Sequence, residues 1–469
     1  APILAVIDSG IRGAHPLLAP AVVGVEVVGA GVGDGGDESG HGTLVASLAL
    51  FGSLEPHLDG QPVVSAAGRL LGIRVLDGEN RFPDDSIWAE LVLEAMEVAK
   101  SAGARVINVS IGDDRRPYLP PRPSSVGALL DQFIRSHPDV VVVTCTGNLS
   151  PVRHDADRLI SNQYIEDLLH MPDGGILDPG TSSLAITVGG VGRDLQHGTG
   201  AASAERVVVG GPRLPSPHTR VGPGPMAAIK PELAAPSGTI VVDTLAGRAS
   251  TMDKLGHVIG AGAAQPDRLL ASDQGTSYAA PLVSHAALRV LGRYPQLSGN
   301  SVRALLLVGA QEMPHYLSDG AKGRTDERRL TGYGLISAER SEASSDHRAV
   351  LLSESRIRMD QVHFYSVPVP ASFRASGGLI SVAAALAFDP PVRVTRLDYM
   401  ASKMGFQIFL GPSVEVVREA YVRAESTEEL EEDVAATPSS LNRYKLDLQP
   451  ADTVRSRGAH QFGRYSRRT

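Results

Sequence analysis

The chain has 469 residues, of which 42% are hydrophobic, 20% charged and 4% aromatic. This length suffices for two or three domains, and the composition excludes a disordered or coiled-coil protein. The formal net charge of −8 excludes a basic field for nucleic acid, and no run of 18 apolar residues is present to cross a membrane, so we expect neither partner.

Short apolar runs alternate with helical patterns through about the first 310 residues. The runs are rich in Val and Ile and apolar on both faces, which is typical of parallel strands covered by helices on both sides. They comprise residues 3–8, 69–76, 105–111, 140–146, 184–189 and 239–243. The helical patterns comprise residues 42–51, 87–102, 126–136 and 276–294. The sequence therefore predicts an α/β fold with a doubly wound, mainly parallel sheet, whose ligands bind at the carboxyl ends of the strands.

Three stretches interrupt this alternation and hold many Pro, Gly, Asp and Arg residues. They are residues 113–125, 150–183 and 192–228. We interpret them as surface insertions that border the cleft.

Asp8 ends the first predicted strand and is followed by Ser9 and Gly10. A carboxylate at this edge can accept a hydrogen bond from an imidazole and fix the tautomer of the ring. Taken alone, an Asp after a strand is more often a turn or helix-cap residue.

His41 stands in the sequence Gly40-His41-Gly42-Thr43, where the next predicted helix begins. The flanking glycines let the backbone turn sharply, and the imidazole can act as general base and then as general acid near neutral pH. Taken alone, one of 14 histidines is more often structural.

The loop before His41 contains Asp34, Asp37 and Glu38. Three carboxylates can bind a structural calcium ion, but a solvated acidic loop is the interpretation we favour. We expect no cofactor and no catalytic metal.

Asn148 and Ser277 complete a set of polar residues at strand ends and helix starts. Asn148 follows the strand at 140–146, where its amide can donate to an oxyanion, and Ser277 opens the helix at 276–294, where free N–H groups favour negative charge. Alone, these would be a turn Asn and a helix cap. Together with Asp8 and His41 they predict a site for nucleophilic acyl transfer.

These residues stand in motifs that resemble those of the subtilase family of serine peptidases. Residues 6–11 resemble the family's Asp motif, 40–43 its His motif and 275–281 its Ser motif, in the family's chain order. Residues 106–112 and 230–236 resemble two further family segments. The resemblance implies a serine endopeptidase that acts on polypeptides, with Asp8, His41 and Ser277 as triad and Asn148 as oxyanion donor.

The same resemblance implies which residues bind the substrate. Glu79 and Asn80 would border the outer subsites. The pocket for the residue before the scissile bond would be walled by Ser110, Ile111, Gly112, Thr144, Cys145, Thr146 and Gly147.

Cys145 is the only cysteine, so no intrachain disulfide can form. We interpret it as a packed small hydrophobe rather than a second nucleophile. The lack of disulfides favours a reducing, cytoplasmic location in a bacterium, with secretion as the alternative.

The composition changes near residue 340, which predicts a peptidase domain at 1–340 and a second domain at 348–469. Turn signals separate β-rich stretches at 362–369, 379–387, 392–399 and 405–410, which predict a small antiparallel β-sandwich or jelly roll. The acidic stretch 425–436 predicts a short exposed helix. The basic stretch 455–468 predicts a solvated or frayed tail.

Residues 364–370 and 386–391 are similar to a sandwich domain of bacterial subtilases that are encoded beside an AAA-type ATPase in anti-phage loci. This resemblance implies an intracellular protease controlled by an AAA ATPase partner. The alternative is a catalytically silent binding protein that works through its sandwich domain.

Overall fold

The computed structural model of the chain describes residues 1–58, 63–84, 87–114, 117–150, 154–193, 205–265, 268–317, 320–369, 377–396, 398–426 and 437–468. Its largest sheet has seven strands in the order β2-β3-β1-β4-β5-β6-β8, and every neighbouring pair is parallel. The strands are β1 (Ile3–Asp8), β2 (Val22–Val27), β3 (Arg69–Arg74), β4 (Ala104–Val109), β5 (Val141–Cys145), β6 (Ile186–Val191) and β8 (Leu233–Pro236).

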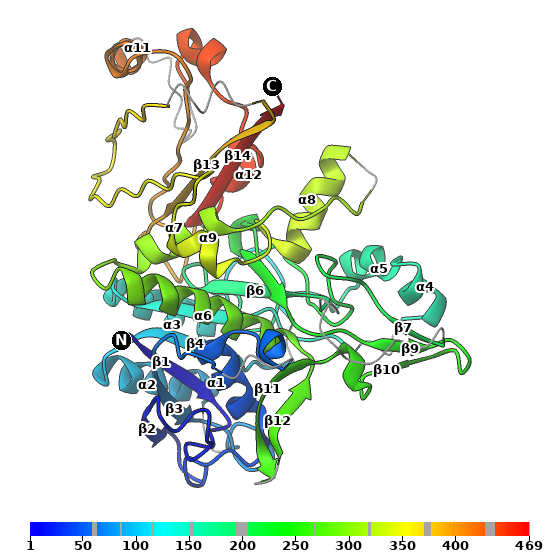
Figure 1. Cartoon of the computed structure of the whole chain (residues 1–469). Coiled ribbons are helices and arrows are strands. Elements are labelled where there is room, and N and C mark those ends of the chain that lie inside the picture. Colours follow the sequence, from blue (N-terminus) through cyan, green and yellow to red (C-terminus); the bar gives the residue numbers. More distant parts are fainter. Residues whose placement is uncertain are drawn as a thin grey trace.

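Helices cover both faces of this sheet, as Figure 1 shows. In β1, Leu4 and Val6 belong to one hydrophobic core with residues of α1, α6 and α7, whereas Ala5 and Ile7 belong to a second core with residues of α2 and α3. The predicted doubly wound α/β fold is thereby confirmed. The helices of this part are α1 (His41–Phe51), α2 (Trp88–Ser101), α3 (Ser125–Ser136), α4 (Ala156–Ile160), α5 (Tyr164–His170), α6 (Thr276–Arg293), α7 (Gly299–Gly309), α8 (Gly320–Thr331) and α9 (Ala338–Glu342).

The predicted strand at 239–243 does not belong to the large sheet. It appears as β9 (Val241–Asp243), which pairs antiparallel with β7 (Arg206–Val208) and β10 (Arg248–Ser250). The edge position in the large sheet is taken instead by β8, which the sequence did not reveal because Pro231 and Pro236 bound this short segment. The antiparallel hairpin of β11 (Val258–Gln265) and β12 (Arg268–Asp273) was also not predicted.

Two of the three predicted insertions carry short regular elements. Residues 150–183 contain α4 and α5, and residues 192–228 contain β7. Buried residues of α4 and α5 pack with Val209, Ile240 and Val242 into a third, smaller core. The insertions are therefore packed against the α/β core rather than free loops.

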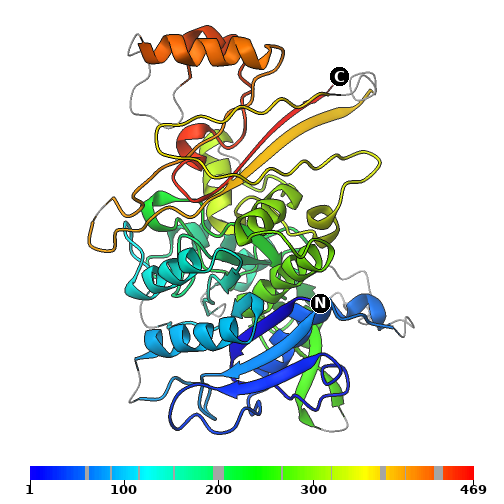
Figure 2. The same ribbon diagram turned by 90° about the vertical axis from the view of Figure 1, so that its left-hand side faces the viewer.

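The C-terminal region contains the predicted antiparallel sheet in the form of β13 (Leu379–Ala387) and β14 (His460–Arg468), which Figure 2 shows side by side. The other described helices here are α11 (Val414–Ser426), η5 (Ser439–Tyr444) and α12 (Asp452–Arg455). No regular strand forms at 362–369, at 405–410 or in the described residues of 392–399, where only isolated bridges occur. Most of the acidic stretch 425–436 lies outside the described residues.

The basic stretch 455–468 is not a frayed tail, so this prediction was wrong. Its second half is strand β14, in which His460, Gln461 and Phe462 are at most 4% exposed. Phe462 packs in the same core as α6 and α7, and Arg464 forms an ion pair with Glu312. Buried side chains therefore outweigh the charges that suggested a solvated tail.

The C-terminal region is fastened to the α/β core by buried polar contacts. Tyr399 donates its hydroxyl proton to Asp131 of α3 over 2.7 Å, and Arg303 of α7 forms an ion pair with Asp389 over 2.7 Å. The domain boundary between 340 and 348 stays a prediction. Among the described helices, none is both long and apolar enough to cross a membrane.

Candidate active site

Three residues from distant parts of the chain form one hydrogen-bonded row. Asp8 ends β1, His41 begins α1 and Ser277 lies in the first turn of α6. His41 Nδ1 lies 2.7 Å from Asp8 Oδ1, and His41 Nε2 lies 3.0 Å from Ser277 Oγ. Asp8 is fully buried, whereas the His41 side chain is 20% exposed. The row therefore runs from the core to an accessible surface.

Asp37 holds the two segments that carry Asp8 and His41. Its Oδ1 accepts hydrogen bonds from Ser9 Oγ at 3.0 Å and from Gly40 N at 2.8 Å. Its Oδ2 accepts from Thr43 N at 2.8 Å and from Thr43 Oγ1 at 2.6 Å. Asp37 thus caps the start of α1, where a carboxylate is favoured by free N–H groups and the helix dipole.

The neighbouring acidic residues are neutralised by a buried cation. Arg74 is 1% exposed, and its Nη1 donates to Gly36 O at 2.6 Å and lies 2.9 Å from Glu38 Oε1. Asp34 Oδ1 is 3.9 Å from the same nitrogen. In the described ranges, no group of three or more His, Cys, Asp or Glu side chains is arranged to hold a metal ion.

The environment of His41 favours its charged form. Burial alone would lower the pKa of His41, but the charge and hydrogen bond of Asp8, together with the charges of Asp37 and Asp273, raise the pKa above its ordinary value. An imidazole with a raised pKa is a stronger base, and it needs a higher pH to be neutral and ready to accept a proton.

The amide of Asn148 has a fixed orientation beside the row. Its Oδ1 accepts hydrogen bonds from Thr276 N at 2.8 Å and Thr276 Oγ1 at 3.1 Å, so Nδ2 faces the other way. A Cβ atom added to Gly275 would lie 3.1 Å from Asn148 Nδ2 and 3.3 Å from Ser277 Oγ. The absence of that atom leaves space within reach of both groups, which is the place that a reacting carbonyl requires.

Arg220 braces the loop that carries Asn148, a role the sequence did not reveal. It is 6% exposed, and its Nε donates to Asn148 O at 3.0 Å. Its Nη1 donates to Asp173 O at 2.7 Å and Gly175 O at 3.0 Å. One buried guanidinium therefore ties the Asn148 loop to the segment that leads to Leu177.

The predicted pocket walls at the ends of β4 and β5 turn most of their side chains inward. Ser110, Ile111, Thr144, Cys145 and Thr146 are at most 7% exposed. What these segments can offer a peptide is mainly backbone, because Ser110 Oγ accepts from Asn108 Nδ2 and Thr144 Oγ1 contacts Thr187 Oγ1. Their role in binding substrate stays a prediction.

Leu177 packs over the glycines of these walls. An added Cβ atom at Gly147 would meet Leu177 Cδ1 at 2.6 Å, and one at Gly112 would meet Leu177 Cβ at 3.7 Å. Leu177 therefore lies between the two segments, although nothing in the sequence pattern indicated it.

Cys145 is buried in the core that contains α6. Burial raises the pKa of its thiol, so it is kept in the unreactive neutral form. This environment is that of a packed small hydrophobe, in line with the prediction.

Glu79 and Asn80 stand in the turn that follows β3. Glu79 forms an ion pair with Arg81 inside this turn, and both side chains are about 70% exposed. Asn80 has a φ of 63°, and Asp77 Oδ1 accepts the N–H groups of Glu79 and Arg81. The turn is thus built around Asp77, and the assignment of Glu79 and Asn80 to outer subsites stays a prediction.

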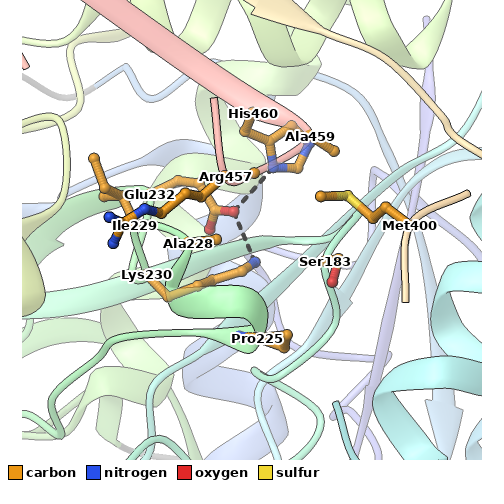
Figure 3. Close-up of a pocket in the computed structure, with 11 residues that line it drawn as sticks. Ser183, Pro225, Ala228, Ile229, Lys230, Glu232, Met400, Arg457, Ala459 and His460 are labelled. Carbon is orange, nitrogen blue, oxygen red and sulfur yellow. Dashed lines mark hydrogen bonds and ion pairs between the residues drawn. The ribbon is translucent and has the colours of Figure 1, made fainter. Parts of the chain in front are cut away.

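A second carboxylate–imidazole pair lies elsewhere, between β8 and β14 (Figure 3). Glu232 Oε1 lies 2.7 Å from Lys230 Nζ and 2.9 Å from His460 Nδ1, and all three residues are at most 3% exposed. Burial lowers the pKa of His460, which Glu232 only partly offsets. The cluster joins the C-terminal strand to the core at a small cavity that Met400 and Arg457 also line.

Comparisons with known proteins agree with this geometry. A family model described as the subtilase family, Peptidase_S8, matches residues 1–334. A protein of Sinorhizobium fredii named only as uncharacterized protein y4bN is 30% identical over 364 residues, covering 76% of this chain and 82% of that one.

Solved structures of proteases also match the chain. A lanthipeptide protease has a TM-score of 0.46 at 18% identity, covering 72% of this chain and 86% of its own. The protease domain of PatA has a TM-score of 0.43 at 18% identity, covering 72% and 93%. The prenylagaramide maturation protease PagA has a TM-score of 0.44 at 20% identity, covering 72% and 91%.

Proposed function

The chain belongs to the subtilase family of serine peptidases, and from that premise we propose that it hydrolyses peptide bonds with Asp8, His41 and Ser277 as its catalytic triad. The observation that carries the proposal is the row of two hydrogen bonds, 2.7 and 3.0 Å long, that joins these three side chains. Hydroxyl, imidazole and carboxylate in this order are the parts that acyl transfer requires.

In the first step, Ser277 Oγ attacks the scissile carbonyl carbon while His41 Nε2 accepts the hydroxyl proton. Asp8 accepts the hydrogen bond of Nδ1–H, holds the tautomer and stabilises the imidazolium. The tetrahedral intermediate then collapses, the C–N bond breaks, and His41 returns the proton to the leaving amine. Water, deprotonated by His41, hydrolyses the acyl-enzyme and restores Ser277.

The oxyanion of the tetrahedral intermediate is assigned to Asn148 Nδ2 and the N–H of Ser277. Support comes from the fixed amide orientation and from the space at Gly275, which lies within hydrogen-bond reach of Nδ2 and next to Ser277 Oγ. The Ser277 N–H lies in the first turn of α6, where backbone donors have no carbonyl partner within the helix.

A fluorophosphonate probe tests this assignment. We expect it to label the wild-type chain and to leave Ser277→Ala unlabelled, because only an activated serine reacts. The matched control is Ser284→Ala on the same helix, whose hydroxyl donates to Asn108 Oδ1 and lies outside the row. Labelling of Ser277→Ala at the wild-type rate would reject the triad, and unlabelled wild type would favour a catalytically silent binding protein.

We further propose that a partner protein, an AAA-type ATPase, regulates the peptidase in the bacterial cytoplasm as part of anti-phage defence. Support comes from the resemblance of residues 364–370 and 386–391 and from exposed apolar side chains in the same region, including Met359, Tyr365 and Val367. Probe labelling that rises only when the purified ATPase is added would support this role, and labelling that is indifferent to the ATPase would contradict it.

A further inference from the structure

Tyr278, the residue after Ser277, packs its ring against His41. The two ring centroids are 5.3 Å apart, and the ring planes are tilted by 47°. Tyr278 is 2% exposed, and its hydroxyl donates to Asp273 Oδ2 over 2.7 Å. A carboxylate, a phenol ring and the imidazole therefore stand in series.

We propose that Tyr278 is a positioning residue for His41, which stabilises the imidazolium that forms during turnover, and that Asp273 strengthens this effect by polarising the phenol. The inference rests on the proposed function and extends it to two residues outside the triad. A cation within about 6 Å of an aromatic ring centroid is attracted by the ring's quadrupole. A phenol that donates to a carboxylate carries more electron density in its ring, which strengthens that attraction.

The position of Asp273 is set by the hairpin β11–β12. Asp273 pairs with Val258 at the end of the hairpin, and Val258 and Ala261 pack in the core that contains α1. Asp273 Oδ1 also accepts the N–H of Gln274 at 2.8 Å. The carboxylate is thus fixed, and it restrains the ring of Tyr278 through the hydroxyl.

The groups that face His41 come from four segments. They are Asp8 from β1, Asp37 from the loop before α1, Asp273 from β12, and Ser277 and Tyr278 from α6. The three carboxylates all favour the imidazolium. Burial, with the charge of Asp273 next, raises the pKa of Tyr278 well above its ordinary value, so the phenol keeps its proton and remains a donor over the working pH range.

The test is the pH profile of kcat/KM for three variants. Asp273→Asn removes the charge and keeps an acceptor, and Tyr278→Phe keeps the ring and removes the hydroxyl. We expect both to move the midpoint of the acid limb down by about 0.3–1 pH unit, because a negative charge near His41 is lost or uncoupled. Tyr278→Leu should also lower kcat about 2- to 30-fold at the pH optimum, with little change in KM.

Matched controls separate this role from a general loss of packing. Tyr164→Phe removes another buried tyrosine hydroxyl, which donates to Pro215 O, and Asp139→Asn removes a carboxylate that pairs with Lys100. Both should leave the midpoint unchanged. An unshifted midpoint in Asp273→Asn and Tyr278→Phe would overturn the proposal, as would a Tyr278→Leu effect confined to KM.

A second readout does not depend on activity. In a Ser277→Ala background, the imidazole of His41 is titrated by NMR with labelled histidine, and Asp273→Asn should lower its pKa in the same direction as the kinetic midpoint. An identical titration with and without Asp273→Asn would reject the role of Asp273 even if the peptidase is inactive. Unlabelled wild type in the fluorophosphonate assay would instead reject the proposed function itself.

Discussion

The molecule contains two carboxylate–imidazole pairs that look alike and behave in opposite ways. Asp8 and His41 lie 2.7 Å apart, and Glu232 and His460 lie 2.9 Å apart. The pKa of His41 is raised although burial opposes it, whereas the pKa of His460 is lowered by burial. The same pair of groups therefore does not carry a function by itself.

The neighbours of each pair explain the difference. Asp37 and Asp273 add negative charge around His41, whereas Lys230 and Arg303 add positive charge around His460. The second nitrogen of His41 faces Ser277 Oγ, while His460 Nε2 is buried without a hydrogen-bond partner among the described residues. The first pair is placed to move a proton, and the second fastens β14 to the core.

The sharpest way to break this comparison is to replace each carboxylate by its amide. Asp8→Asn should lower kcat/KM by about 10³–10⁴-fold, because the imidazole loses the acceptor that fixes its tautomer. Its effect on the free energy of unfolding should be small. Glu232→Gln should lower that free energy by about 3–5 kcal/mol, because it leaves the charge of Lys230 buried and unpaired.

Hydrolysis of a peptide library and denaturant unfolding, measured on both variants, check the two effects. Probe labelling per folded molecule should be unchanged in Glu232→Gln. Loss of labelling in a fully folded Glu232→Gln variant would place the buried cluster in the chemistry, contrary to our account.

The oxyanion assignment gives the next largest effect. Asn148→Leu should lower kcat by about 10²–10³-fold, a size measured at the corresponding donor in subtilisin, a relative of this chain. The melting temperature, followed by circular dichroism, should change little. An unchanged kcat would remove Asn148 from the site.

Arg220 should have a smaller effect on the same donor. Arg220→Met removes three hydrogen bonds to backbone carbonyls, so Asn148 and the Leu177 segment can shift, and we expect kcat to fall roughly 10- to 100-fold. Arg213→Met is the control, because Arg213 is a surface residue that donates to Gln311. If Arg220→Met affects only thermal stability, Arg220 has no positioning role.

The two histidines should also separate by pH. Activity should rise to a midpoint above about 6.5, because the raised pKa of His41 keeps it protonated to higher pH. Stability should fall as the pH drops below about 6.5, since the unfolded chain then binds a proton that buried His460 resists. His460→Gln should reduce the slope of unfolding free energy against pH by up to about 1.4 kcal/mol per pH unit. An unchanged slope would contradict this use of His460.

The sequence predicted the row correctly in one respect, which is where its members lie in the fold. Asp8 ends a strand, while His41 and Ser277 each begin a helix, and these positions meet at the carboxyl edge of a parallel sheet. Local patterns were enough for the large sheet as well, because its strands are short apolar runs. The strand β8 was missed because its two prolines conceal the pattern.

The supporting residues could not be predicted, because their roles depend on contacts between distant segments. Arg220 lies in a loop without periodicity and acts 72 positions away on Asn148 O. Glu232 and His460 are 228 positions apart. Asp37 was noticed only as a calcium candidate, since a carboxylate before a helix has the same appearance whether it caps the helix or binds a cation.

The most direct test of the account is a crystal structure of the chain after reaction with a fluorophosphonate. We predict phosphorus bonded to Ser277 Oγ, with a phosphoryl oxygen about 2.7–3.1 Å from Asn148 Nδ2 and from the Ser277 N–H. An adduct on another residue, or a phosphoryl oxygen that points away from Asn148 while His41 still contacts Asp8, would contradict it.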